Sequence, residues 1–302
     1  MRALVTGAGG FVGAHLAARL VADGWDVVGT VRPGSPAPAG VDPAGIEIVP
    51  VDLTGPAATA EAAGRVDPDV VFLLAAARAA ATPAERASTV AVNASSGSWL
   101  VDGLGDRCRA VVRLGSSTEY GATDVPMDET TPLRPRGFFG ATKAAGSLLV
   151  AATAAARGIR AVVLRAFQVY GPGDHPSRLV PAALRAARAG EVLPLTGPGL
   201  GRDSVYVDDV VEACMRAALA DDLPPGQVLN VGTGRQVAND ELVAMVAEVS
   251  GRPVRTAAGA HPRRSWDTGS WVCDPSLAAD LLGWEAKVAL ADGLGRCWDA
   301  GR

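Results

Sequence analysis

The chain has 302 residues, of which 48% are hydrophobic, so it can bury one large core or two smaller ones. Its formal net charge of −4 provides no basic surface for nucleic acid or an anionic membrane, which favours a small molecule as the partner. We expect a cytoplasmic protein, because no apolar run approaches the ~20 residues of a membrane helix and the start does not resemble a signal peptide. The cysteines are scattered and predict neither a disulfide nor a metal site.

Short β-branched segments alternate with alanine-rich segments of helical pattern along the first half of the chain. This alternation predicts an α/β fold of the Rossmann type, in which helices cover both faces of a doubly wound parallel sheet. The expected strands are Arg2–Thr6, Asp26–Val31, Ile46–Pro50, Val70–Leu74, Ala110–Leu114 and Ala161–Arg165. The expected helices are Phe11–Asp23, Pro56–Gly64, Pro83–Leu104 and Phe139–Arg157.

The segment Thr6–Gly13 follows the first expected strand and opens the first expected helix. Gly7 permits a tight turn, Gly10 lets the backbone approach a pyrophosphate, and Gly13 lets the helix pack on the strand. The helix N-terminus adds amide donors and a positive dipole. The segment therefore predicts an NAD(P) site, whose contacts we assign to Gly7, Gly9, Gly10, Phe11, Val12 and Gly13.

The end of the second strand bears on the choice of cofactor. An NAD-specific enzyme usually has an acidic residue there for the ribose 2′-hydroxyl, whereas this chain has Arg32. A guanidinium suits a 2′-phosphate, so we predict NADPH rather than NADH, with Ser35 as a candidate second donor. A plain solvated Arg32 is the alternative. Asp52 and Leu53 follow the third strand, where they would meet the adenine, although an aspartate there is also a common turn former.

The alternation of strands and helices loosens beyond Arg165, where Gly/Pro loops occupy Gly171–Pro176 and Thr196–Gly201. We expect residues 1–166 to form the NADP-binding domain. A smaller C-terminal substrate-binding lobe would comprise residues 167–203 and 233–302. The segment Ser204–Val211 is expected to return to the first domain, which would then continue to about residue 232.

A series of further segments follows Thr6–Gly13 in the chain: Asp52-Leu53, Leu74-Ala75-Ala76, Asn93, Gly115–Gly121, Lys143, Tyr170-Gly171-Pro172, Arg202 and Tyr206–Asp209. In this order they resemble an extended short-chain dehydrogenase/reductase of the NAD-dependent epimerase/dehydratase family, over almost the whole chain. The resemblance implies that Leu74, Ala75, Ala76 and Asn93 join the cofactor site. The segment Gly115–Gly121 is most similar to that of the GDP-4-keto-6-deoxymannose reductases, which reduce sugar ketones.

The catalytic set of this family is a Ser or Thr, a Tyr, and a Lys four residues after the Tyr. The resemblance assigns Ser116 and Lys143 to this set, with Ser117 as an alternative serine. Phe139 occupies the Tyr position and Phe138 precedes it, so shifting the alignment by one residue restores no hydroxyl. In this family the lysine also holds the nicotinamide ribose, which makes Lys143 an expected cofactor contact.

The absence of the Tyr hydroxyl has a chemical consequence. Hydride delivery to a carbonyl carbon builds negative charge on the oxygen, and a positioned general acid speeds such a step by ~10²–10⁴. A phenol or enol of the substrate, hydrogen-bonded to the carbonyl, could replace that acid. Four interpretations of Phe139 remain open: substrate assistance, an acid relocated to Tyr120 or Glu119, a Tyr→Phe variant of an ordinary enzyme, and a non-catalytic sensor.

Substrate contacts are expected from the second half of the chain. Gln168 stands where sugar-nucleotide enzymes of the family usually have Asn, which counts against a sugar diphosphate. Arg202 resembles a diphosphate-binding arginine, but it could equally bind a carboxylate or be structural. His175 and Arg178 lie on a Gly/Pro loop of the kind that often carries ligand contacts, although a lone histidine there is more often a surface residue.

The preferred function is an NADPH-dependent ketoreductase for a large aromatic polyketide ketone, because the missing Tyr makes the chain similar to the atypical ketoreductases of angucyclinone tailoring. The alternatives are an NDP-sugar reductase, epimerase or dehydratase, and an NADP-binding regulator without turnover. Trp266 and Trp271 predict either an aromatic wall or ordinary packing. A monomer and a homodimer are both compatible with the apolar faces of the expected helices Pro83–Leu104 and Phe139–Arg157.

Overall fold

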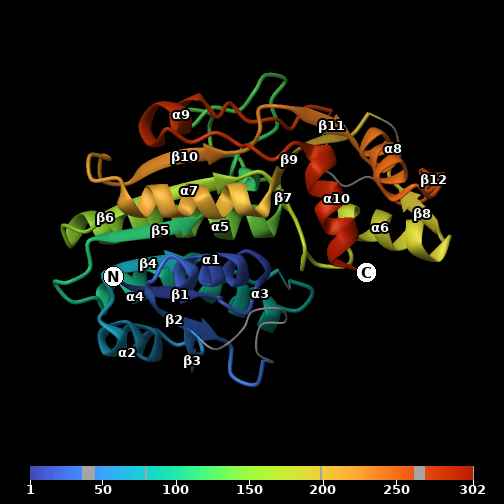
Figure 1. Ribbon diagram of the computed structural model, residues 1–302. Helices are drawn as coiled ribbons and strands as arrows, with labels where there is room; N and C mark the ends of the chain where they lie inside the picture. Colours follow the sequence, from blue (N-terminus) through green and yellow to red (C-terminus); the bar gives the residue numbers. More distant parts are fainter. Residues whose placement is uncertain (36–44, 79, 198, 262–268, 302) are drawn as a thin grey trace.

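The computed structural model describes the chain except for residues 36–44, 79, 198, 262–268 and 302. Its centre is a seven-stranded sheet with the spatial order β10-β6-β5-β4-β1-β2-β3 (Figure 1). The strands are β1 (Arg2–Thr6), β2 (Asp26–Val31), β3 (Ile46–Pro50), β4 (Val70–Leu73), β5 (Ala110–Leu114), β6 (Arg160–Ala166) and β10 (Gln227–Val231). Every neighbouring pair is parallel, which confirms the predicted doubly wound fold.

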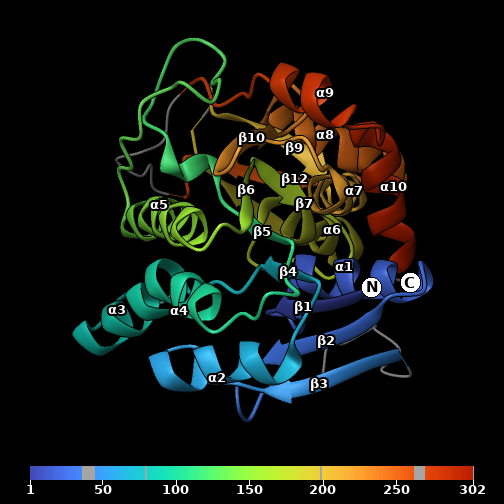
Figure 2. The ribbon, with the colours of Figure 1, turned by 90° about the vertical axis from the view of Figure 1, so that its left-hand side faces the viewer.

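Helices cover both faces of this sheet (Figure 2). One layer contains α2 (Pro56–Val66), α4 (Ser96–Asp102) and α5 (Phe138–Ala156), and the other contains α1 (Phe11–Ala22) and α7 (Val207–Leu219). Successive strand residues point to opposite layers: Leu4 belongs to the apolar cluster with Leu100 and Val150, whereas Val5 belongs to the cluster with Leu16. Burial on both faces explains why the strands are nearly continuous apolar runs.

The predicted helix Pro83–Leu104 is helical in the structure from Pro83 to Asp102, with one irregular turn inside it. It consists of α3 (Pro83–Val90), the π-helical turn η2 (Ala91–Ser95) and then α4. The carbonyl oxygen of Asn93, inside the turn, accepts a hydrogen bond of 2.6 Å from Nη2 of the buried Arg113. A π-helical turn interrupts the regular helical hydrogen bonding, so this tertiary contact explains a break that local sequence pattern did not predict.

The second half of the chain adds two smaller sheets. A three-stranded sheet contains β7 (Gln168–Tyr170), β9 (Gly201–Tyr206) and β11 (Gln236–Ala238), and a two-stranded sheet contains β8 (Val192–Leu195) and β12 (Arg255–Ala258). The accompanying helices are α6 (Leu179–Ala189), α8 (Asn239–Ser250), α9 (Ser276–Leu282) and α10 (Leu290–Ala300). Within the segment Ser204–Val211, for which a return to the first domain is expected, residues 204–206 pair with β7, and α7 contacts β5 and β6 of the large sheet.

Helix α5 is the one described helix that is long and apolar enough to cross a membrane by length and composition. The expectation that no apolar run approaches that length therefore needs correction. The helix packs against α4 and β6, and 44% of its apolar window is buried inside the protein. Packing in the core accounts for part of its apolar composition, while Leu148 and Leu149 are exposed.

Candidate active site

The turn after β1 has the close backbone packing that a dinucleotide-binding turn requires. Gly7 has a φ of 71°, a conformation that favours glycine, and a Cβ there would lie 2.8 Å from Cα of Ala75. A Cβ on Gly13 would lie 2.1 Å from the carbonyl oxygen of Gly7. Only glycine at position 13 therefore lets α1 pack this closely on the end of β1.

The first turn of α1 provides unpaired amide donors beside this glycine turn. The amide of Ala14 donates to the carbonyl oxygen of Gly10 at 2.9 Å, so the amides of Phe11, Val12 and Gly13 precede the helical hydrogen bonds. This turn contains no acidic residue to offset the positive end of the helix dipole. Gly9 and Gly10 are exposed. Exposed glycines and free amides fit the pyrophosphate of NAD(P).

Arg32 and Asp52 lie beyond the ends of the adjacent parallel strands β2 and β3, which brings them to the same edge of the sheet. The side chain of Arg32 is exposed. One carboxylate oxygen of Asp52 accepts hydrogen bonds from the amide and hydroxyl of Thr54 at 2.9 and 2.7 Å. These bonds hold the pKa of Asp52 below its usual range. Asp52 thus stabilises a turn after β3, which was the alternative to an adenine contact. The neighbouring Leu53 is half-buried.

The segment after β4 is fastened next to the glycine turn. The hydroxyl oxygen of Thr6 accepts hydrogen bonds from the amides of Leu74 and Ala75 at 3.1 and 3.2 Å. Asn93 is buried, and its amide group forms two hydrogen bonds of 2.8 Å with the backbone of Ala77. Asn93 therefore holds the backbone that follows Ala75 in place, which is a positioning role.

The two adjacent serines after β5 have different surroundings. The hydroxyl of Ser116 is half-buried and lies 2.8 Å from the hydroxyl of Thr118. The hydroxyl of Ser117 is buried and accepts a hydrogen bond of 3.0 Å from the indole nitrogen of Trp271. Trp271 in turn packs in an apolar cluster with Tyr120. Ser116 is thus the better candidate for a substrate contact, while Ser117 and Trp271 join two segments of the fold.

Helix α5 brings Phe139 and Lys143 beside these serines. A Cβ on Gly140 would lie 2.2 Å from the carbonyl oxygen of Thr118, so the helix packs directly on the turn that contains the serines. The Lys143 ammonium is buried and donates a hydrogen bond to the carbonyl oxygen of Leu114. Burial, with a smaller contribution from Arg113, lowers the pKa of Lys143 to about 7.

The structure contradicts the hypothesis that Glu119 or Tyr120 replaces the missing tyrosine as the acid. The Glu119 side chain is fully buried, and one of its oxygens lies 3.1 Å from Nε of the buried Arg165. The Tyr120 hydroxyl is buried and donates to the side-chain oxygen of Asn230 at 2.8 Å. Burial also raises the pKa of Tyr120 to about 12. Neither group can exchange a proton with a substrate, because each is buried and engaged within the core.

Arg78 is a residue that sequence reasoning missed. It lies on the segment after β4, and Cζ of its guanidinium lies 4.5 Å from the ring centroid of Phe139. The pKa of Arg78 is lowered overall, because burial and the charge of Arg178 outweigh the opposite effect of the Asp174 carboxylate. The signal in the sequence was its position two residues after Ala76, within a segment already assigned to the site.

The predicted substrate contacts lie in several places. Gln168 is half-buried in β7, next to β9, which contains Arg202. Arg202 donates to the carbonyl oxygen of Gly201 at 2.7 Å, and its guanidinium lies 5.5 Å from the ring centroid of Trp271. His175 is exposed, and its ring lies 2.7 Å from the hydroxyl of Ser177. Trp266 lies outside the described residues, so only Trp271 is accounted for, by packing.

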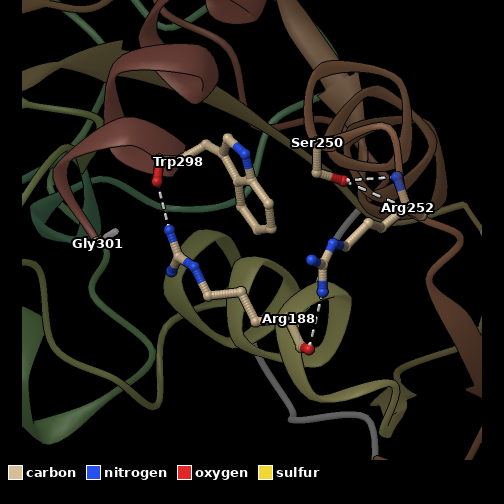
Figure 3. A pocket seen from close by; sticks show the side chains of 5 residues that line it. All are labelled: Arg188, Ser250, Arg252, Trp298 and Gly301. Atoms are coloured by element: carbon tan, nitrogen blue, oxygen red, sulfur yellow. Dashed lines mark hydrogen bonds between the residues drawn. The ribbon is translucent and has the colours of Figure 1, made fainter.

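A separate hollow of about 450 Å³ lies where α6, α8 and α10 meet, and it is lined by Arg188, Ser250, Arg252, Trp298 and Gly301 (Figure 3). None of the predicted site residues lines it. Arg188 donates to the carbonyl oxygen of Trp298, and Arg252 donates to that of Arg188. These bonds satisfy carbonyls at or near the ends of α10 and α6, which gives the arginines a structural role.

Known proteins are similar to this chain over nearly its full length. A UDP-glucose 4-epimerase from Mycolicibacterium smegmatis is 32% identical, covering 98% of this chain and 97% of the relative. A dTDP-6-deoxy-L-talose 4-dehydrogenase (NAD(P)(+)) from Kitasatospora kifunensis is also 32% identical, covering 99% and 95%. The structure of MoeE5 in complex with UDP-glucuronic acid and NAD has a TM-score of 0.87 and 32% identity, covering 100% and 99%.

The family model that matches describes the NAD dependent epimerase/dehydratase family and covers residues 3–232. This span includes the glycine turn, the serines after β5 and Lys143. With the geometry of the turn and the full-length relatives, the match shows that the chain belongs to the NAD dependent epimerase/dehydratase family.

Proposed function

We propose that this chain is an NADPH-dependent reductase of a ketone that carries its own proton donor. The observation that supports this proposal is Phe139, which has no hydroxyl, in a site that keeps Ser116 and Lys143. Hydride transfer to a ketone needs a proton for the oxygen, and Phe139 cannot supply one. A neighbouring hydroxyl of the substrate can supply this proton instead.

The residues around Phe139 support the reductive step in separate ways. The amide of Thr118 donates to the Ser116 oxygen, and the Thr118 hydroxyl can do so too, so the Ser116 hydrogen is available for a substrate carbonyl. A bound reduced nicotinamide would supply the hydride to the carbonyl carbon. Lys143, with a pKa of about 7, would hold the ribose hydroxyls as it does in the family.

The choice of cofactor within the family rests on Arg32. Its guanidinium is exposed at the end of β2, where it would meet a 2′-phosphate. The structure of MoeE5 contains NAD, so this chain would differ from that relative in preferring NADPH. For the substrate, we propose a large aromatic polyketide ketone, bound between the Rossmann domain and a lobe formed by residues 167–203 and 233–302.

A second candidate substrate is the ketone of an NDP-sugar. The relatives favour it, since they include a UDP-glucose 4-epimerase and a dTDP-6-deoxy-L-talose 4-dehydrogenase. Arg202, half-buried next to Trp271, is the residue of this chain that would bind the diphosphate. This candidate also requires an explanation for Phe139, because a sugar ketone has no acidic hydroxyl next to the carbonyl.

The test is NADPH oxidation with two matched aromatic ketones and a 4-keto-6-deoxy NDP-sugar. One aromatic ketone has a hydroxyl hydrogen-bonded to the carbonyl, and in the other that hydroxyl is methylated. We expect turnover of the hydroxylated ketone alone, and little gain from Phe139→Tyr, because the substrate already supplies the proton. Phe138→Tyr is the control, since it adds a hydroxyl to the exposed neighbouring residue.

Three other outcomes would contradict this proposal. If both aromatic ketones are inert until Phe139→Tyr restores a hydroxyl, the chain is a disabled form of an ordinary enzyme. Turnover of the NDP-sugar alone would support the second candidate. Stoichiometric NADPH binding without oxidation of any ketone would indicate a regulator.

A further inference from the structure

Arg78, which lies over the Phe139 ring, interacts electrostatically with two charged side chains from a segment far away in the sequence. Arg78 comes from the segment after β4, and Asp174 and Arg178 come from the loop between β7 and α6. Nε of Arg178 lies 3.6 Å from one Asp174 carboxylate oxygen, and the guanidinium of Arg78 lies over the Phe139 ring. The segment with Arg78 follows a strand of the large sheet and the loop with Asp174 follows a strand of the three-stranded sheet, so the group joins two parts of the fold.

The charges in this group do not balance. Asp174 is one carboxylate opposite two guanidinium groups, and Lys143 lies close enough for Arg78 to lower its pKa. The Asp174 side chain is only 5% exposed, and its second oxygen has no hydrogen-bond partner among the described residues. The group therefore has excess positive charge, which favours an anionic or strongly polar ligand, whereas the unpartnered Asp174 oxygen is an acceptor that a hydrogen-bond donor would fill.

Arg78 is placed to make that contact. Its side chain is exposed to solvent, yet burial is the main cause that lowers its pKa. Both observations hold together if protein atoms surround most of the guanidinium while one side stays open. Cζ of the guanidinium lies 4.5 Å from the centroid of the Phe139 ring, and the N–H donors of the group lie in its own plane, where they can bind a ligand.

We propose that Arg78 replaces the missing tyrosine hydroxyl as the group that binds the reacting oxygen of the substrate. Its guanidinium would donate to two oxygens at once, the carbonyl oxygen and the adjacent phenol or enol oxygen. The substrate class is therefore a ketone with an acidic hydroxyl hydrogen-bonded to its carbonyl. This inference rests on the proposed function and identifies the protein group that makes substrate assistance effective.

The chemical step balances with the hydride of a reduced nicotinamide and one proton from water. A C–H bond forms at the carbonyl carbon as the carbonyl π bond breaks, and the oxygen takes the proton of the adjacent hydroxyl. The negative charge then lies on the phenolate or enolate oxygen, which Arg78 stabilises as an oxyanion-hole donor does. Water returns the proton to that oxygen when the product leaves.

The inference is tested with Arg78→Gln and Arg78→Lys, and with Arg65→Gln as the matched control on the exposed face of α2. With the hydroxylated ketone at saturating NADPH, we expect Arg78→Gln to lower kcat by about 100-fold, the usual cost of losing an oxyanion donor. Arg78→Lys should restore only part of this loss, because lysine keeps the charge but cannot donate to two oxygens in one plane. The Kd for NADPH should stay unchanged.

A binding experiment separates this inference from the proposed function. The probe is 1-hydroxy-2-naphthoate, a non-reducible compound with a hydroxyl next to a carboxylate, whose binding is followed by its fluorescence in the NADP-loaded protein. We expect at least about tenfold weaker binding to Arg78→Gln, whether or not any ketone is turned over. No binding to the wild type, or equal binding to both proteins, overturns the inference. A weaker NADPH affinity with unchanged kcat also overturns it, since Arg78 would then hold the cofactor.

Discussion

The two edges of the site are built in different ways. The cofactor edge consists of backbone from consecutive residues, Gly7–Gly13, and depends on close packing and free amides. The substrate edge that we propose consists of side chains from three distant segments, which contribute Arg78, Phe139 and Asp174. A backbone site depends on a few glycines, so a short motif describes it. A side-chain site can change one residue at a time, so the substrate can change while the cofactor fold persists.

The largest expected effect tests the backbone edge. Gly13→Val adds a Cβ that would lie 2.1 Å from the Gly7 carbonyl oxygen, so the turn must open. We expect NADPH binding to fall by more than about 100-fold, because the amides and the helix dipole no longer converge on the pyrophosphate. Titration of the cofactor by fluorescence measures this loss.

Two further variants keep that test interpretable. Gly10→Ala places its Cβ 3.1 Å from the same carbonyl oxygen and should give a smaller loss in a protein that still folds. Gly295→Ala, where a Cβ meets nothing within 4 Å, should bind NADPH normally. Normal NADPH binding by Gly13→Val would contradict the view that close backbone packing defines this edge.

Lys143 joins the two edges, and Lys143→Met should lower the rate of reduction by about 100-fold. The same variant should change how stability depends on pH. In the cofactor-free protein, the pKa of Lys143 is lowered from 10.5 to about 7 by burial, so between these values the unfolded chain binds more protons. The free energy of unfolding of the wild type therefore rises with pH across this window.

Urea unfolding at several pH values between 7 and 10.5 measures this effect. The methionine variant has no amine to deprotonate, so its stability advantage over the wild type should be largest near pH 7 and shrink towards 10.5. A constant difference across this range would show that folding does not lower the pKa of Lys143. Lys287→Met, at an exposed lysine, provides the comparison.

The smallest expected effect concerns the adenosine end. Arg32→Ala should weaken NADPH binding by about tenfold and leave NADH binding unchanged, because only NADPH carries the 2′-phosphate that a guanidinium would pair with. The ratio of the two Kd values is the measurement. An equal effect on both cofactors would show that Arg32 is a solvated side chain without a role in selectivity.

Most of the large sheet could be predicted from the sequence, because each strand is a short β-branched run bounded by turns. All six strands expected in the first half agree with the structure to within a residue at either end. The π-helical turn around Asn93 could not be predicted from local pattern. Its carbonyl oxygen is bound by Arg113 of β5, and the two residues meet only when the chain folds. The hypothesis of an acid at Glu119 or Tyr120 failed for a similar reason, because burial depends on the segments that cover these side chains.

The sequence by itself determined the parallel α/β fold, the glycine turn and the absence of a hydroxyl at Phe139, because each follows from residue type and local spacing. The tertiary structure decided which serine faces the site, that Lys143 has a pKa of about 7, and that Arg78 lies over Phe139. The physical reason is that burial, ring contacts and charge interactions act through space. They depend on which segments meet at the sheet edge, and neighbours in the sequence do not define that set.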